Sequence, residues 1–109
     1  MPDAWASQLQ GRHVLREDVQ GGRGCRITLT DQRTIGGYAL TSDEPCIRRL
    51  AIPEDIFAWF IDAEGRLVLI DATRKPLLRM QPLSSDGEFH AQRSPPQRGN
   101  LVLSVDTTP

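Results

Sequence analysis

The chain has 109 residues, of which 39% are hydrophobic and 25% are charged, and these proportions are typical of one soluble globular domain rather than a disordered chain. Its formal net charge of −1, from 13 basic and 14 acidic residues, excludes a global basic field that would attract nucleic acid or an anionic membrane. The longest apolar run, near Ile56–Ile61, is far too short to cross a bilayer, so we expect no membrane insertion.

The first ten residues are predicted to be distinct from the rest of the chain. Ala4–Gln10 can form a short helix, with Asp3 as its N-cap and Gly11 as its stop. Trp5 lies in this segment, outside any predicted strand, where it either plugs one end of the domain or anchors a partner protein.

From Gly11 onward, hydrophobic and polar residues alternate with period two between turn signals rich in glycine, proline, serine and aspartate. Eight sequential strands with short connections favour an antiparallel up-and-down β-barrel, because closure leaves no exposed edge. We therefore expect an all-β barrel domain over residues 11–109, after an N-terminal segment over residues 1–10. The predicted strands lie near residues 12–17, 24–30, 34–40, 56–62, 66–71, 77–82, 88–93 and 100–106.

A barrel of eight strands is just wide enough to be filled by side chains or to hold one small ligand. The larger apolar side chains that alternate along the strands favour a filled interior. They are Phe57, Trp59, Leu69, Met80, Phe89 and Leu103.

Cys25 and Cys46 are the only cysteines, and their spacing does not fit a C-x-x-C metal or redox motif. One interpretation is a disulfide, which would imply an oxidising compartment and contribute about 3 kcal/mol for a closed loop of roughly 20 residues. The other is two buried free thiols in a cytosolic domain. No apolar export signal follows Met1, which fits either a cytosolic protein with free thiols or an exported one whose signal peptide has been removed.

No pattern of catalytic or metal-binding residues is present, so we expect neither an enzyme nor a cofactor. The two histidines, His13 and His90, lie on different predicted strands and have no metal-site spacing. His90 alternates with Phe89 and Ala91 and is expected to face solvent, and His13 is expected near one end of the barrel.

An ordered set of short motifs runs through roughly residues 6–93. The motifs are Leu9-x-Gly11, Val14-Leu15, Cys25-x-Ile27-x-Leu29, Tyr38-Ala39-Leu40, Cys46, Trp59, Gly65-x-Leu67-x-Leu69, Ser85-Asp86-Gly87 and Phe89. In this order they resemble the bacterial inhibitors of serralysin-type alkaline metalloproteases. The chain departs from that family at His13, where the family usually has Trp, and Met1–Trp5 do not match the family's N-terminal trunk.

The resemblance implies a small periplasmic or secreted protein, monomeric on its own, with an eight-stranded barrel and one disulfide between Cys25 and Cys46. It also implies a secreted zinc metalloprotease as partner, with an N-terminal trunk that enters the active-site cleft. In this chain the corresponding protease-contacting residues would be Met1, Pro2, Asp3, Ala4 and Trp5. The alternatives are a lipocalin-like barrel for a small apolar ligand and a non-inhibitory envelope interaction domain of the same fold.

Overall fold

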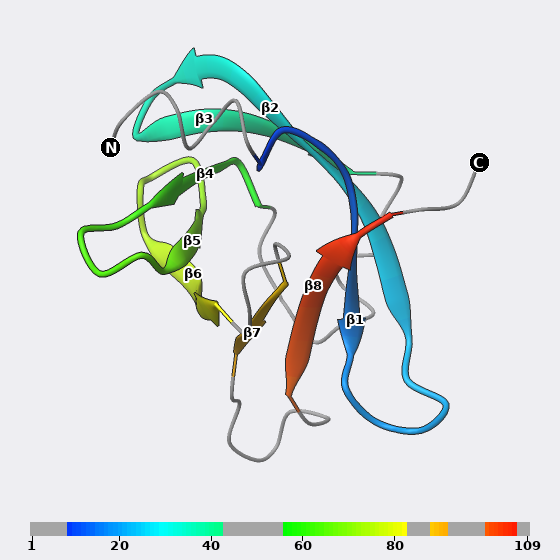
Figure 1. The fold of residues 1–109 in the computed structure, drawn as a ribbon. Coiled ribbons are helices and arrows are strands. Elements are labelled where there is room, and N and C mark those ends of the chain that lie inside the picture. Colours follow the sequence, from blue (N-terminus) through cyan, green and yellow to red (C-terminus); the bar gives the residue numbers. More distant parts are fainter. Residues whose placement is uncertain (1–8, 43–55, 83–87, 92–99, 107–109) are drawn as a thin grey trace.

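A computed structural model of the protein describes residues 9–42, 56–82, 88–91 and 100–106. Within these residues eight strands form one closed antiparallel barrel, in which each strand pairs with its neighbours in sequence and β8 pairs with β1 (Figure 1). The all-β, up-and-down barrel predicted from the sequence is thus confirmed. The strands are β1 (Gly11–Glu17), β2 (Gly24–Thr34), β3 (Gly37–Ser42), β4 (Ala58–Ile61), β5 (Leu67–Ile70), β6 (Pro76–Pro82), β7 (Phe89–Ala91) and β8 (Leu101–Val105).

The barrel interior is filled by apolar side chains from all eight strands, as the alternating pattern predicts. Trp59, Leu69, Met80 and Leu103 are completely buried, and Phe89 is 5% exposed. The remaining members of this core are Leu15, Cys25, Ile27, Leu29, Tyr38, Leu40, Ile61, Leu67, Ala91 and Leu101.

Phe57 does not belong to this core, and its predicted place in the interior is wrong. It lies just before β4 and is 37% exposed, and its backbone N–H donates to the carbonyl oxygen of Ile70 at 2.8 Å. The period-two pattern extends from Trp59 back to Phe57, but the strand that would keep this face inward begins only at Ala58.

The β2–β3 hairpin differs from the prediction in where it turns. We expected strands over residues 24–30 and 34–40, with the connection between them, whereas β2 continues to Thr34 and the turn lies at Ile35–Gly36. The register shifts between Leu29 and Arg33, so an irregularity lets β2 bend while it stays paired with β3.

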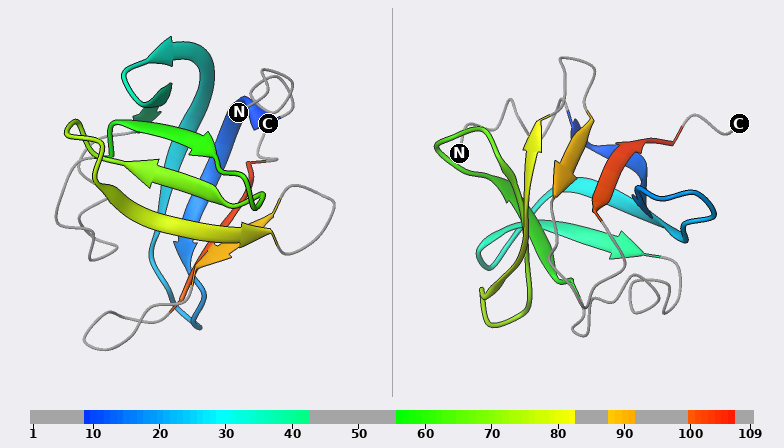
Figure 2. Two further views of the ribbon diagram at one scale, coloured as in Figure 1. Left: turned by 90° about the vertical axis from the view of Figure 1, so that its left-hand side faces the viewer. Right: turned by 90° about the horizontal axis from the view of Figure 1, so that it is seen from below.

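The outer face of the β4–β5 hairpin is also apolar and buried, through Ala58, Val68 and Ile70. The β2–β3 turn packs closely on this face. A Cβ added at Gly36 would lie 2.8 Å from the Cδ1 atom of Ile70, and one at Gly37 would lie 2.5 Å from the carbonyl oxygen of Trp59. Glycine at both positions therefore permits the approach. All four residues of β5, which lies between β4 and β6 (Figure 2, left), are buried, so the strand is covered on both faces.

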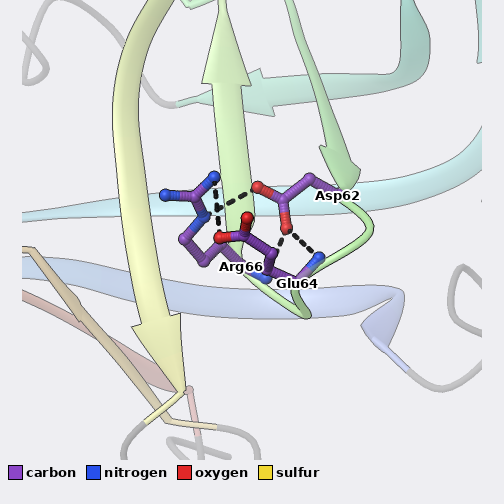
Figure 3. Close-up of polar contacts among 3 residues, drawn as sticks. All are labelled: Asp62, Glu64 and Arg66. Atoms are coloured by element: carbon purple, nitrogen blue, oxygen red, sulfur yellow. Dashed lines mark hydrogen bonds and ion pairs between the residues drawn. The ribbon is translucent and has the colours of Figure 1, made fainter.

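The β4–β5 and β5–β6 hairpins have turns of the same construction, each headed by an aspartate. Oδ1 of Asp62 accepts hydrogen bonds from the backbone N–H groups of Glu64 and Arg66, both at 2.9 Å (Figure 3). Nine residues later, Oδ1 of Asp71 accepts from Thr73 N–H at 2.8 Å and from Lys75 N–H at 2.9 Å.

Each turn consists of the aspartate and a three-residue loop after it. The third loop residue adopts a left-handed conformation in both turns, which is usual for such hairpins. Gly65 has φ of 81°, and Arg74, at the equivalent place, has φ of 70°. The two turns align as DAEGR (residues 62–66) and DATRK (residues 71–75).

The predicted N-terminal helix, Ala4–Gln10, falls mostly outside the described residues, although Leu9 is helical. Cys25 is buried on β2, at 2% exposure, while Cys46 lies outside the described residues, so their disulfide remains a prediction. In the ranges that the structure describes, no helix is long and apolar enough to span a membrane.

Candidate functional site

The predicted protease-contacting residues, Met1–Trp5, lie outside the described residues, but the structure describes where their segment joins the barrel. Leu9 is partly buried and packs against the barrel core. Gly11, the first residue of β1, has φ of +129°, a conformation that favours glycine over any residue with a Cβ. Leu9 therefore packs on the core at one end of the barrel, and Gly11 supplies the backbone conformation with which β1 begins.

His13 lies inside the barrel next to this junction and is only 3% exposed. Its Nδ1 lies 3.2 Å from the carbonyl oxygen of Gly11 and donates a hydrogen bond in the Nδ1–H tautomer. Burial lowers the pKa of His13, and the hydrogen bond to Gly11 opposes this shift only in part. The imidazole thus serves as a neutral interior group near one end of β1, as expected for its place in the sequence.

The start of β1 shares one end of the barrel with two of the hairpin turns. Because consecutive strands run in opposite directions, the β2–β3 and β4–β5 turns belong to the same end as the start of β1, and the β1–β2 turn belongs to the other. In Figure 1 the start of β1 is at the top, the β2–β3 turn is at the upper left and the β1–β2 turn is at the lower right. We call the first of these ends the N-terminal end.

A solvent-open pocket of about 550 Å³ lies at this end, between the β2–β3 hairpin and the end of β4. Arg33 and Gly36 contribute from the hairpin, and Phe60 and Asp62 contribute from β4 and the turn after it. We call it the hairpin pocket. Ile35, at the tip of the hairpin, is 62% exposed.

The guanidinium of Arg33 is placed at the hairpin pocket by contacts that lead into the core. Its Cζ atom lies 5.6 Å from the ring centroid of Tyr38, which is a cation–π contact. The Tyr38 ring lies 5.5 Å from the ring of Trp59, and the indole Nε1 of Trp59 donates to the carbonyl oxygen of Thr30 at 3.1 Å. The exposed Arg33 thus lies over the buried ring of Tyr38, which in turn packs against the buried ring of Trp59.

Asp62, the acidic residue at the hairpin pocket, is engaged within its own turn. Burial raises the pKa of its carboxyl, but hydrogen bonds from Arg66 and from the Glu64 N–H outweigh burial and hold that pKa below its usual value. The Nε of Arg66 lies 2.8 Å from Oδ2 of Asp62, and its Nη2 lies 3.3 Å from Oε2 of Glu64 (Figure 3). The charge of Asp62 is therefore paired with that of Arg66 within the turn.

The hairpin pocket was not predicted from the sequence, because the turn was placed at the wrong residues. A strand over 34–40 would make Ile35 one more alternating residue, whereas the turn at Ile35–Gly36 puts it at a tip. The signal that could have located the turn is Gly36-Gly37, a pair that favours a hairpin. Among the described residues, no group of three or more histidine, cysteine, aspartate or glutamate side chains could hold a metal ion.

Comparison with known proteins identifies the family. A family model described as "Protease inhibitor Inh" matches residues 3–104, which is nearly the whole chain. The chain belongs to the Inh family of protease inhibitors. This membership confirms the resemblance to a protease inhibitor family, and since the Inh family is one of inhibitors, the chain is not an enzyme.

A solved structure supports the fold of this Inh family member. The chain resembles the crystal structure of a psychrophilic marine protease MP inhibitor, with a TM-score of 0.67 and 13% sequence identity. The match covers 93% of this chain and 98% of that one, so the two share the whole barrel. A search of curated protein sequences finds no match.

Proposed function

We propose that this Inh family member inhibits a secreted zinc metalloprotease of the serralysin type, and that Met1–Trp5 occupy the active-site cleft. The observation that carries the proposal is the family match, which begins at residue 3 and so includes most of this segment together with the barrel. The described junction agrees with it, since Leu9 packs against the core immediately before β1. A cleft-filling segment would thus be held by a rigid body.

The open coordination position of a catalytic zinc ion explains why a peptide segment can block such an enzyme. Such an ion keeps one position for water or substrate, and an extended peptide segment can fill the cleft beside it as a substrate would. Attachment to a filled barrel reduces the conformational freedom that the segment loses on binding, which favours affinity. The complete burial of Trp59, Leu69 and Met80 indicates that the barrel is such a body.

A disulfide between Cys25 and Cys46 and a periplasmic or secreted location belong to the same proposal. The supporting observation is that the part of the chain that the structure describes contains no free cysteine, although Cys25 is within it. A cross-link from β2 to the segment before β4 would stabilise the barrel in an oxidising compartment, where its target protease would also be found.

The lipocalin-like alternative is less well supported, because apolar side chains from all eight strands, together with the buried His13 and Glu17 of β1, fill the interior. A barrel of this size that holds a ligand needs smaller residues on its inner face. On this proposal the functional surfaces are the N-terminal segment and the outside of the barrel. The protein acts as a monomer.

The proposal is tested by measuring inhibition of two purified secreted proteases, one a serralysin-type zinc enzyme and the other a subtilisin-type serine enzyme. Cleavage of a peptide substrate is followed at increasing concentrations of the full chain. We expect inhibition of the zinc enzyme alone, with a raised apparent KM and an unchanged kcat. Absence of inhibition at micromolar concentration, or equal inhibition of both enzymes, contradicts the proposal and favours a different partner.

A further inference from the structure

We propose that the outer face of the barrel over β1, β2 and β8 binds a linear acidic polysaccharide. These three strands lie side by side, with β1 in the middle (Figure 1). We call this surface the arginine face, after Arg12 and Arg16 of β1 and Arg26 of β2. The proposal is separate from protease inhibition. Three observations carry it: the arrangement of the arginines, the acidic groups near them and the side chains between them.

The first observation is the arrangement of the three arginines. From residue 13 to residue 17 every second side chain of β1 is buried, so Arg12 and Arg16 face outward, with Cα atoms about 13 Å apart. Val14 lies between them on the same face, and its partner across the strands is Arg26. Arg26 is therefore a diagonal neighbour of both other arginines, about 7–8 Å from each. The three guanidinium groups can thus contact one extended anionic chain that runs along the strands.

The second observation is that acidic side chains balance only part of this charge. Oδ2 of Asp106, directly after β8, lies 3.6 Å from Nε of Arg26 and restrains a side chain that stays 61% exposed. Arg12 and Arg16 are exposed, and neither forms an ion pair with another residue that the structure describes. The arginine face therefore has a local excess of positive charge, although the formal net charge of the whole chain is −1.

The third observation is the kind of side chain between the arginines. Thr28, the partner of Arg12, and Ser104, the partner of Val14, place partly exposed hydroxyl residues on this face. Hydroxyl groups both donate and accept hydrogen bonds, as sugar hydroxyls require, and arginine binds carboxylate and similar anions in a bidentate manner. Guanidinium groups beside hydroxyls are thus the combination that suits an acidic sugar polymer.

The same face lacks the groups that other anionic partners use. None of its outward positions on β1, on β2 up to Thr30 or on β8 holds an aromatic ring, on which the bases of a single-stranded nucleic acid would stack. None of them holds an exposed large hydrophobic residue, which a surface that enters a membrane interface needs. These two properties favour a polysaccharide over nucleic acid or an anionic membrane.

The shape of the face favours a polymer over a small ligand. Small molecules are bound in concave sites, whereas the arginine face is the outer surface of a closed barrel. A single exposed ion pair contributes little to binding, so several contacts must be made by one molecule. A linear polymer meets this requirement because it can reach all three arginines at once.

The test measures binding of a heparin-derived octasaccharide to the full chain by isothermal titration calorimetry, in about 0.1 M salt, where the Debye length is about 10 Å. The face variant combines Arg12→Gln with Arg16→Gln and keeps Arg26 and its ion pair. The matched control combines Arg74→Gln with Arg79→Gln, which removes the same charge from exposed arginines on β6 and in the turn before it. We expect the face variant to raise Kd at least tenfold and the control to stay within threefold of wild type.

Thermal unfolding is measured for both variants, and it should change by only a few degrees because all four substituted arginines are exposed. The proposal is refuted if the unaltered chain does not bind the octasaccharide, or if the face variant and its control lose affinity equally. Tighter binding of an oligothymidylate, or of phosphatidylglycerol vesicles, would also overturn it and assign the face to nucleic acid or to a membrane surface. Inhibition of the zinc protease by the face variant should equal that of wild type, so this proposal and the proposed function are tested separately.

Discussion

The indole Nε1 of Trp59, on β4, donates a hydrogen bond to the backbone carbonyl oxygen of Thr30, on β2, at 3.1 Å. The two residues are separated by β3, and Thr30 lies in the stretch where the β2–β3 register shifts. The hydroxyl of Thr30 donates in turn to the carbonyl oxygen of Ala39 on β3, at 2.7 Å. The hydrogen bond from the buried Trp59 therefore stabilises the irregular stretch of β2 around Thr30. This contact helps to set the direction of the β2–β3 hairpin beyond that stretch.

Replacement of Trp59 tests this relationship. Trp59→Phe removes the donor to Thr30 and leaves a cavity in a fully buried site, so we expect a loss of about 2–4 kcal/mol in the free energy of unfolding. Urea unfolding followed by circular dichroism measures the loss. A variant that retains wild-type stability would show that the Trp59–Thr30 contact does not support the fold.

Substitutions at the two equivalent left-handed residues, Arg74 and Gly65, are expected to change the free energy of unfolding in opposite directions. Arg74→Gly relieves an unfavourable conformation and should raise the free energy of unfolding by about 1 kcal/mol, while Gly65→Ala should lower it by about 1 kcal/mol. No atom lies within 4 Å of a Cβ at Gly65, so only its backbone conformation opposes the alanine. Thermal unfolding of both variants tests this prediction. A shift of the unfolding temperature in the same direction for both would contradict the equivalence of the turns.

The faces of β7 are tested by two neighbouring alanine substitutions. Phe89 is 5% exposed and belongs to the core, so Phe89→Ala should cost about 3–5 kcal/mol. His90 is only partly buried, on the outward face, and His90→Ala should change stability by about 0.5 kcal/mol or less. Urea midpoints of the two proteins give the comparison, and similar midpoints, or a lower one for His90→Ala, would mean that the faces are reversed.

His13 predicts a specific dependence of stability on pH. Because burial lowers its pKa below 6.5, the unfolded chain binds a proton more tightly than the folded one, and stability falls as pH drops below about 6.5. One such group contributes a slope of at most about 1.4 kcal/mol per pH unit. Between pH 7 and 5, His13→Gln should therefore lose less stability than wild type in urea titrations. Parallel losses in the two proteins would exclude His13 as a source of the dependence.

The sequence predicted the barrel well because period-two alternation and turn residues are local signals. The predicted strands include all or most of each observed strand, and the inward residues Trp59, Met80 and Phe89 were correctly identified. What could not be predicted depends on contacts between distant segments. The β2–β3 turn position depends on how Gly36 and Gly37 pack against β4 and β5, and the pocket exists only because of that packing.

Phe57 shows the same limit at a strand boundary. Its alternation with Trp59 predicts burial, but alternation cannot tell which residue begins the strand. The N-terminal segment is different in kind, since its proposed role depends on a partner, and the residues within it carry no local signal of that partner. Only the family match connects the segment to protease inhibition.

The most direct test of the account compares the inhibition constants of the full chain and of a chain lacking Met1–Trp5 against the same serralysin-type zinc protease. Thermal unfolding of both proteins is measured in parallel, because Leu9 and the barrel are retained in the shorter chain. The account predicts that the deletion raises the inhibition constant at least a hundredfold while the unfolding temperature falls by only a few degrees. Equal inhibition by the two proteins would contradict the claim that the N-terminal segment occupies the cleft.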